Sequence, residues 1–367
     1  MAVSNSISNT TFRTQRVLDE AYRNCRLTAE QISAEMQEEA RNKLYLLLSE
    51  LANLGQPLWC IDKQILALYQ GDPNVPCPSG TVTVLNANLR TLQRLTGTAT
   101  SSAGGTVANA FDDDLSTSCT QTAPNGSITV EFDTPQSFTT IGLIAGGSSN
   151  ISFTVESSID GVSYSPVYTG TLVGGALSGD RRWVWVDPLD QSDSDFSYSD
   201  SVNDVSFIRL TATGGTTLDI AEFYIGNTPQ EIPLALTNRD DYMSLPNKTF
   251  QSIRPTQYWL DLQRDIPYLR IWPTANATGA FYQITMYRQR YIMDVGTLTQ
   301  TLDIPQKWYS AIVDALAWRL SKSRKEVDMN LIPMLKADAE ASARLAWGGQ
   351  SDQSGIQFRP QIRRYTR

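Results

Sequence analysis

The sequence predicts an α+β multidomain protein: a helical body with a small β region, and an inserted all-β sandwich. The first observation is charge. Residues 96–228 hold sixteen acidic and three basic side chains, a net of −13, whereas the whole chain of 367 residues sums to −8. The second is composition, because Ser, Thr, Gly and Asp turns separate short apolar runs in that block, as in a β-sandwich. The third is that helical periodicity recurs near both chain ends. We therefore expect one scaffold, formed by the two flanking halves, with a guest domain set into it.

The N-terminal half, residues 1–95, is expected to begin with two helices within 11–53. The second, over 28–53, is the clearer, because Thr28 and Gln31 form a capping box and Gly55 ends the element. Apolar side chains recur along it at i, i+3 and i+4. They are Ile32, Met36, Ala40, Leu44, Leu47, Leu48 and Leu51. This pattern predicts an amphipathic helix packed on a neighbour.

The block 96–228 is expected to be an all-β domain. Its predicted strands are Ser127–Phe132, Thr139–Ala145, Ile151–Ser157, Arg182–Val186 and Ser206–Ala212. Between the last two, Asp187–Asp204 carries six aspartates and no basic residue. We interpret this run as a solvated loop, and binding of a metal or a cationic partner is the alternative.

The C-terminal half, residues 229–355, is expected to start with a linker marked by Pro229 and Pro233. Three strands follow, and then two helices over 305–325 and 327–347. The strands are Tyr258–Leu262, Tyr268–Trp272 and Phe281–Arg290. The last segment, 356–367, has four arginines, no acid and interleaved apolar side chains. It reads as an arm that docks on a partner protein, with a frayed terminus as the alternative.

Composition excludes several classes of site. The chain has no histidine, which removes Ser-His-Asp and Cys-His nucleophile pairs and the common zinc-hydrolase sites. No paired Asp/Glu stands in a recognisable catalytic context, so we do not expect an enzyme. The four cysteines form no CxxC pair, which suggests neither a zinc site nor a disulfide framework. The first residues lack the apolar run of a secretory signal, and no window approaches the ~20 apolar residues of a membrane helix.

The inserted block resembles the discoidin, or coagulation-factor C-type, family of galactose-binding-like β-sandwiches. The resemblance covers about 100–227 and rests on several motifs in order. They are Ala108-Asn109-Ala110-Phe111-Asp112-Asp113-Asp114, Thr117, Val155-Glu156-Ser157-Ser158-Ile159-Asp160-Gly161-Val162-Ser163-Tyr164, Phe207-Ile208-Arg209-Leu210 and Ala221-Glu222-Phe223-Tyr224-Ile225. The resemblance implies a structural calcium ion at Asp112, Asp114, Thr117 and Glu222, whose oxygen ligands suit that ion. Here Asp113 replaces the family's usual glycine and Cys119 its usual tryptophan. The family also implies binding of sugars or lipid headgroups through loops at one end of the sandwich. Because the sequence shows no decisive aromatic platform there, we favour a spacer or decoration role, with glycan binding as the alternative.

The flanking halves, 11–95 and 230–367, resemble the head-to-tail adaptor, or connector, of short-tailed bacteriophages. The order of several segments carries this resemblance. They are Leu58-Trp59, the 69–81 turn, Arg239-Asp240-Asp241-Tyr242, Asn247-Lys248, Pro255, Tyr258, Pro267-Tyr268-Leu269-Arg270-Ile271-Trp272-Pro273, Tyr291-Ile292-Met293-Asp294, and Leu302-Asp303-Ile304-Pro305-Gln306-Lys307-Trp308 running into 311–320. An inserted sandwich departs from the simple family pattern.

The adaptor resemblance implies a dodecameric ring beneath the portal protein. The ring would extend the DNA channel, help retain packaged genome and connect the capsid to the tail nozzle or next tail protein. The residues implied in ring packing are Trp308, Ile312, Leu316, Leu331 and Leu335. Those implied in portal docking are Ile356, Phe358, Arg359, Ile362, Arg363, Arg364, Tyr365 and Arg367. The strands over 258–290 are implied as the distal surface.

Two functions are therefore expected from the sequence. The first is a structural virion protein of the viral tail, a portal adaptor assembled in the host cytoplasm, with its sandwich facing outward as a decoration. No cofactor is required beyond the structural calcium, and no membrane partner is expected. The alternative is a carbohydrate- or host-surface-binding virion protein that acts through the discoidin-like domain.

Overall fold

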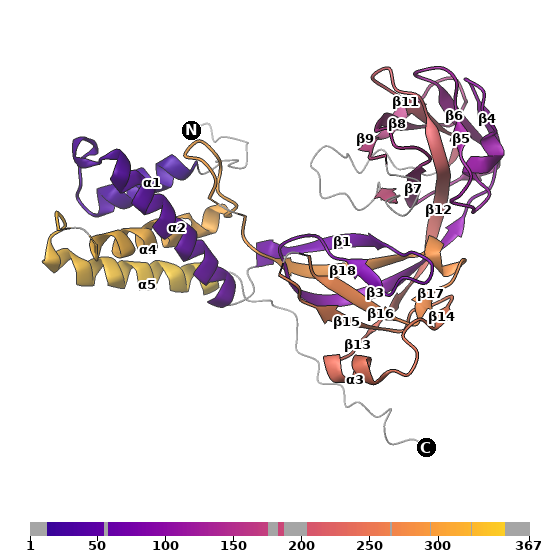
Figure 1. Cartoon of the computed structure of the whole chain (residues 1–367). Coiled ribbons are helices and arrows are strands. Elements are labelled where there is room, and N and C mark those ends of the chain that lie inside the picture. The colour runs from indigo at the N-terminus through magenta and orange to yellow at the C-terminus, as the bar shows by residue number, and fades with distance from the viewer. Residues whose placement is uncertain are drawn as a thin grey trace. The chain divides into compact units, whose positions relative to one another are not determined.

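A computed structural model describes residues 13–54, 58–174, 183–186, 204–264, 266–293, 295–323 and 325–348. The chain divides into two compact units: Met1–Asp62 with Gln289–Arg367, and Lys63–Arg288. The first is mainly helical and the second is built of strands (Figure 1). The described residues before 63 and after 288 thus belong to one unit, while residues 63–95 and 229–288 belong with the sandwich. No described helix is long and apolar enough to cross a membrane.

The helical unit contains α1 (Thr14–Asn24), α2 (Ala34–Leu54), α4 (Tyr309–Ser321) and α5 (Ile332–Gly348). Short 3-10 turns η1 (Ala29–Gln31), η2 (Leu58–Cys60), η5 (Gln306–Trp308) and η6 (Met329–Leu331) precede or connect them. Side chains from both ends of the chain share one core. Its members with almost no exposure include Val17, Leu18, Ala21, Tyr22, Ala40, Leu44, Leu316, Ala317 and Leu320.

The predicted helix starts were early, for a local reason. The Thr28 N–H donates to Gln31 Oε1 at 3.0 Å, so that half of the predicted capping box forms, but it closes η1. The α2 helix begins at Ala34, where Ser33 Oγ accepts from the Met36 N–H at 3.3 Å. Likewise, the Asp328 side chain accepts from the Asn330 N–H and caps η6, so α5 begins only at Ile332.

The residues implied in ring packing lie inside this unit. Trp308, Ile312, Leu316, Leu331 and Leu335 are all buried in the core that one chain forms by itself. The Trp308 ring lies 5.2 Å from the Trp59 ring and 5.0 Å from the Trp347 ring, measured between centroids. In the structure these five side chains pack the helices of a single chain against one another.

The sandwich consists of two sheets facing each other. One sheet has the order β4-β6-β11-β8-β9 and the other includes β12, β7, β10 and β5. Their bounds are β4 Thr98–Ser101, β5 Cys119–Thr120, β6 Ser127–Gln136, β7 Thr140–Ala145, β8 Ile151–Ser158, β9 Ser165–Leu172, β10 Val184–Val186, β11 Val205–Ala212 and β12 Asp219–Pro233. Between them lies a core of alternating apolar residues that includes Ile128, Ile141, Leu143, Phe153, Val155, Ile208, Leu210 and Phe223.

The five predicted strands of the block are all present as β6, β7, β8, β10 and β11, whereas β4, β5, β9 and β12 were missed. The longest that lies wholly within the block is β9. Its sequence begins Ser165-Pro166 and contains Gly170, which weakens the usual strand signal. Asp187–Asn203, which is nearly all of the predicted acidic loop, lies outside the described residues. Asp204 is described and directly precedes β11.

Two long strands continue the sandwich into the small β region. The strand β3 (Thr81–Arg94) pairs with β12, and the same sheet goes on through β18 (Gln283–Arg290) to β1 (Ile61–Ala67). The predicted linker is therefore part of β12. Pro229 falls at the register shift between Asn227 and Gln230, where the ladder is interrupted, and Pro233 is the last residue of the strand.

A second sheet covers the small β region, with the order β13-β15-β16-β2. Its bounds are β13 Ala235–Leu236, β15 Gln257–Asp261, β16 Tyr268–Trp272 and β2 Asn74–Pro76, accompanied by α3 Arg239–Ser244, η4 Gly279–Phe281 and the pair β14 Gln251–Ser252 with β17 Thr274–Ala275. The core of this region includes Leu68, Leu89, Leu269, Ile271, Ile284 and Met286.

Candidate functional site

An aromatic cluster covers the outer face of the β12–β7–β10 sheet. Along β12, Phe223 and Ile225 enter the sandwich core, so Tyr224 between them lies on the opposite face. There the Tyr224 ring stacks on Phe281 with centroids 5.9 Å apart, and Trp183 stacks on Trp185 at 4.7 Å. The Trp183 and Phe281 rings meet edge to face at 5.8 Å.

Gly142 explains why two large rings fit on this face. It lies opposite both Trp185 and Tyr224 in the sheet register. A Cβ atom at Gly142 would come within 2.2 Å of the Trp185 ring. The glycine therefore makes the space in which the indole lies flat on the sheet.

A pocket of about 230 Å³ borders this cluster. Three segments of the strand-built unit line it together with Trp183. The lining residues are Leu68, Tyr69, Gln70, Asp113, Asp114, Leu115, Ser116, Trp183, Ala277, Ala280 and Phe281. The backbone N–H of Trp183 donates to the Tyr69 hydroxyl at 3.1 Å, which holds these two residues together. The pocket thus combines aromatic rings with exposed carboxylates, a hydroxyl and an amide.

The acidic side of the pocket is a tightly bonded turn. Asp112 Oδ1 accepts from the Asp114 N–H at 2.9 Å, and Asp112 Oδ2 accepts from Thr117 Oγ1 at 2.8 Å. Asp114 Oδ1 accepts from the Ser116 hydroxyl at 2.7 Å and from its N–H at 2.9 Å, and these bonds lower the pKa of Asp114. Asp113 has a φ of 60°, the left-handed conformation that glycine adopts most easily and that aspartate tolerates.

Arg94 ties this turn to the sheet. Its guanidinium donates to Asp113, to Glu222 and to the Phe223 carbonyl, the last at 3.1 Å. The guanidinium carbon also lies 5.1 Å from the Tyr224 ring centroid and 5.7 Å from that of Phe111. Only 15% of the Arg94 side chain is exposed, so this cation is embedded in the wall between the turn and the sheet.

Glu222 is the buried member of this ion cluster. Its side chain has 0% exposure, and its Oε2 has no hydrogen-bond partner among the described residues. Burial raises the pKa of Glu222 to about 7, against the opposing effect of Arg94. The negative charges of Asp113 and Asp112 add to the rise, because they repel the ionised form of Glu222.

The residues of the expected calcium site are thus divided. Asp112, Asp114 and Thr117 meet in one turn, whereas Glu222 is bound by Arg94. In the part of the chain that the structure describes, no group of three or more His, Cys, Asp or Glu residues is placed to hold a metal ion. The positive charge beside Glu222 is the guanidinium of Arg94.

Sequence reasoning missed Arg94, because this residue lies outside the expected boundary of 96–228 and belongs to no recognisable local motif.

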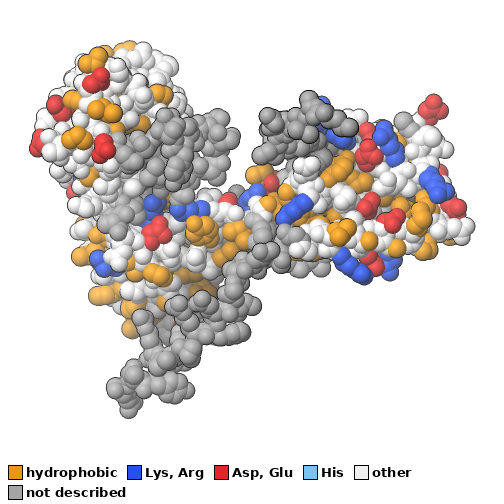
Figure 2. All heavy atoms as spheres, turned by 180° about the vertical axis from the view of Figure 1, so that it is seen from behind, with side chains coloured by type: hydrophobic (Ala, Val, Ile, Leu, Met, Phe, Trp, Pro, Cys, Tyr) orange, Lys and Arg blue, Asp and Glu red, His pale blue; other side chains and the backbone are white. Residues whose placement is uncertain are grey.

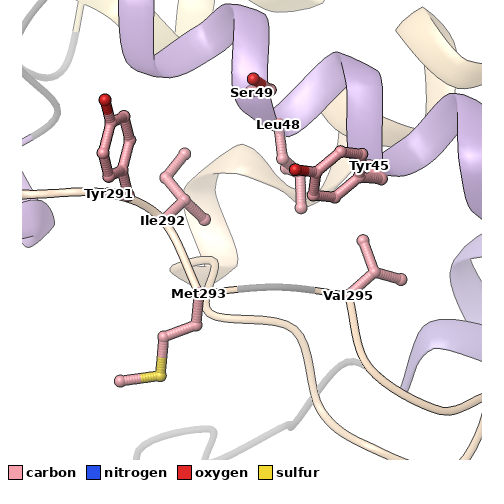
Figure 3. Close-up of a pocket in the computed structure, with 7 residues that line it drawn as sticks. All are labelled: Tyr45, Leu48, Ser49, Tyr291, Ile292, Met293 and Val295. Atoms are coloured by element: carbon pink, nitrogen blue, oxygen red, sulfur yellow. The ribbon is translucent and has the colours of Figure 1, made fainter. Parts of the chain in front are cut away.

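The helical unit has a groove of its own, of about 270 Å³. Tyr45, Leu48 and Ser49 from α2 line it together with Tyr291, Ile292, Met293 and Val295 from the segment after β18 (Figure 3). Tyr45, Tyr291 and Met293 are 52%, 55% and 63% exposed. The portal-docking residues expected within 356–367 lie outside the described residues.

The four cysteines, Cys25, Cys60, Cys77 and Cys119, are buried free thiols. Burial raises the pKa of the first three to about 11 and also raises that of Cys119. Thiolates are the reactive form, so these side chains act as core residues.

Comparison with known proteins adds likenesses for the sandwich. No family model and no curated protein matches the chain. Among solved structures, a truncated AlyQ with CBM32 and alginate lyase domains is 20% identical and covers 42% of this chain and 38% of its own, with a TM-score of 0.30. The CBM32 of AlyQ in complex with 4,5-unsaturated mannuronic acid is 20% identical and covers 36% of this chain and 97% of its own, with a TM-score of 0.29. A Clostridium perfringens module, CpGH89CBM32-5, in complex with GalNAc-β-1,3-galactose, is 16% identical and covers 35% and 93%, with a TM-score of 0.27. Over about a third of its length, the chain is thus similar to carbohydrate-binding modules.

Proposed function

We propose that this chain is a carbohydrate-binding protein and that the pocket between the aromatic cluster and the acidic turn is its saccharide site. The observation that carries the proposal is the composition of this pocket, in which Trp183, Tyr69 and Phe281 lie together with Asp113, Asp114 and Gln70. Sugar rings have apolar C–H faces and hydroxyl edges. A pocket with aromatic surface and a few fixed polar groups matches both.

The fixed geometry of the polar groups supports this proposal. The turn that presents Asp113 and Asp114 is held by its own hydrogen bonds and by Arg94. Pre-organised groups lose little conformational freedom when a ligand binds, which favours affinity for a small polar molecule. The visible face of the sandwich has acidic side chains scattered over mostly uncharged surface (Figure 2).

A glycan array with the full-length chain, followed by calorimetry on the hits, tests the proposal. Gln70→Ala removes an exposed pocket amide and is expected to weaken binding about five- to tenfold, which corresponds to one hydrogen bond. Gln263→Ala is the matched control, because Gln263 is also exposed and does not line the pocket. Equal affinities for the two variants would place any sugar binding elsewhere, and a blank array would refute the function.

A second proposal concerns the helical unit. We propose that it serves as the oligomerising and docking part of a head-to-tail adaptor in a virion, with a portal protein above and a tail nozzle below. The observation in favour is that both chain ends build one helical unit with an exposed apolar groove, while the sandwich is inserted between them. In this role DNA passes through the ring and the sandwich decorates its outside.

Native mass spectrometry of the full chain, alone and mixed with a candidate portal protein, tests the adaptor role. A dodecamer on the portal is the expected result. Deleting residues 356–367 is expected to abolish that attachment while the circular dichroism spectrum stays unchanged. Attachment by the truncated chain would refute the docking arm, and failure of the whole chain to bind any portal would refute the adaptor.

A further inference from the structure

We propose that the pocket on the sandwich prefers saccharides with a free ammonium group over neutral saccharides, and disfavours uronates. This inference rests on the proposed carbohydrate-binding function and names the chemical class of its ligand. Its evidence is the charge of the lining residues and the hydrogen bonds of Arg94, the cation beside the acidic turn.

Two carboxylates line the pocket. Asp114 Oδ1 accepts hydrogen bonds from the hydroxyl at 2.7 Å and from the N–H of Ser116 at 2.9 Å, so one oxygen is fixed and Oδ2 is left for a ligand. Asp114 is exposed at the pocket, so a ligand can reach the carboxylate. Asp113 gives one oxygen to Arg94 and lies in the same lining. An ammonium group placed between these two residues would make charge-assisted hydrogen bonds.

Arg94 does not neutralise this surface. Its donors point to Glu222, Asp113 and the Phe223 carbonyl, and it is not among the lining residues. The charged groups that face Arg94 are Asp113 and Glu222, with Asp112 beside them, so the cluster as a whole remains acidic. No Lys or Arg occurs among the described residues that line the pocket.

The aromatic residues add to the same preference. Tyr69, Trp183 and Phe281 are among the lining residues, and aromatic side chains attract cations as well as sugar C–H groups. A carboxylate on the ligand would meet Asp113 and Asp114 and lose affinity through repulsion of like charges.

Calorimetry on the full-length chain at pH 6 tests the inference with a matched set of β-1,4-linked disaccharides: the glucosamine dimer, the N-acetylglucosamine dimer, cellobiose and a glucuronate-containing analogue. At this pH most of the amine is protonated, because an amino group flanked by electron-withdrawing oxygens titrates somewhat below the ~7.7–8.0 of an α-amino group but still above pH 6. The glucosamine dimer is expected to bind about tenfold more tightly than cellobiose, and the glucuronate analogue more weakly than both. The tenfold ratio should fall as salt is raised, because salt screens partly exposed charges.

The variant Asp114→Asn is expected to reduce the ratio of the glucosamine-dimer and cellobiose affinities to about twofold or less. Asp160→Asn is the control, because Asp160 accepts bonds in a similar turn of the β8–β9 loop and does not line the pocket. It should keep the tenfold ratio. The same ratio for Asp114→Asn as for the wild type would overturn the assignment of Asp114.

The outcomes separate the two proposals. If none of the disaccharides binds and the array is blank, the carbohydrate function itself is refuted. If the four bind equally, or the uronate binds most tightly, the function stands and the charge preference is overturned. If the uronate binds most tightly, the double variant Arg181→Gln/Arg182→Gln identifies the cation. Loss of the uronate preference in this variant would show that the two arginines before Trp183 in the sequence attract the carboxylate.

Discussion

The buried carboxyl of Glu222 leads to a prediction about stability and pH. In the fold its pKa rises from the ordinary 4.5 to about 7, mainly because of burial. The difference between these pKa values corresponds to about 3 kcal/mol of folding free energy. The folded protein binds this proton more tightly than the unfolded chain does, so the stabilisation is complete below pH 4.5 and is lost as the pH rises to 7. Stability is therefore expected to fall over this range.

The variant Glu222→Gln isolates this effect, because its amide does not titrate. Urea unfolding followed by tryptophan fluorescence gives the free energy of unfolding of the variant and of the wild type from pH 5 to pH 8. The variant's stability relative to the wild type is expected to increase by about 3 kcal/mol over this range. Other titrating groups, such as Asp314, whose pKa burial also raises, cancel in this difference.

Two variants sharpen this experiment. Glu156→Gln removes a carboxylate paired with Arg209 at 2.8 Å on the other sheet, and it controls for the loss of an Arg–Glu pair. Arg94→Met should cost more at pH 8 than at pH 5, because it leaves an ionised buried carboxylate without its cation. A difference between Glu222→Gln and the wild type that stays constant or shrinks with pH would show that the ion pair outweighs burial, and would refute the reasoning.

Three further predictions concern packing. Gly142→Ala should destabilise the sandwich by about 1–3 kcal/mol and alter its tryptophan fluorescence, because the Trp185 ring must move from a Cβ 2.2 Å away; an unchanged denaturation midpoint would contradict this. Leu316→Ala should cost about 2–5 kcal/mol in thermal or denaturant unfolding, since its side chain is fully buried in the helical core, and a loss under 1 kcal/mol would count against that core. The thiols with a pKa of about 11, Cys25, Cys60 and Cys77, should resist alkylation at pH 8 until urea is added, as mass spectrometry of the labelled chain can show; rapid native labelling would contradict their burial.

Local signals in the sequence predicted much of the fold. Apolar periodicity located α1, α2, α4 and α5 and fewer than half of the described strands, and the switch in charge and composition marked the sandwich. The errors have physical causes. Two helices begin later in the chain than predicted, because the side chains of Ser33 and Asp328 cap turns beyond the predicted start. Pro229 was interpreted as part of a linker, but it falls at a register shift within the strand β12.

The candidate site was less predictable than the fold. The sequence singled out Asp112, Asp114, Thr117 and Glu222, and three of these four do meet in one turn. Arg94 and the aromatic residues of the pocket come from segments far apart in the chain. The sheet order β1-β18-β3-β12-β7-β10 brings these segments together, and no local pattern in the sequence specifies that order.

The long strands β3 and β12 also have a mechanical consequence. A domain inserted through a flexible loop can turn freely and can open without disturbing its host. Here the polypeptide enters and leaves the sandwich through two strands that are bonded to each other from Asn88 to Arg94. A force that pulls the sandwich away from the small β region would be carried along both covalent backbones at once, while the hydrogen bonds between them keep the two strands from separating. The joint between the two regions is therefore a paired ribbon of two strands and not a single tether.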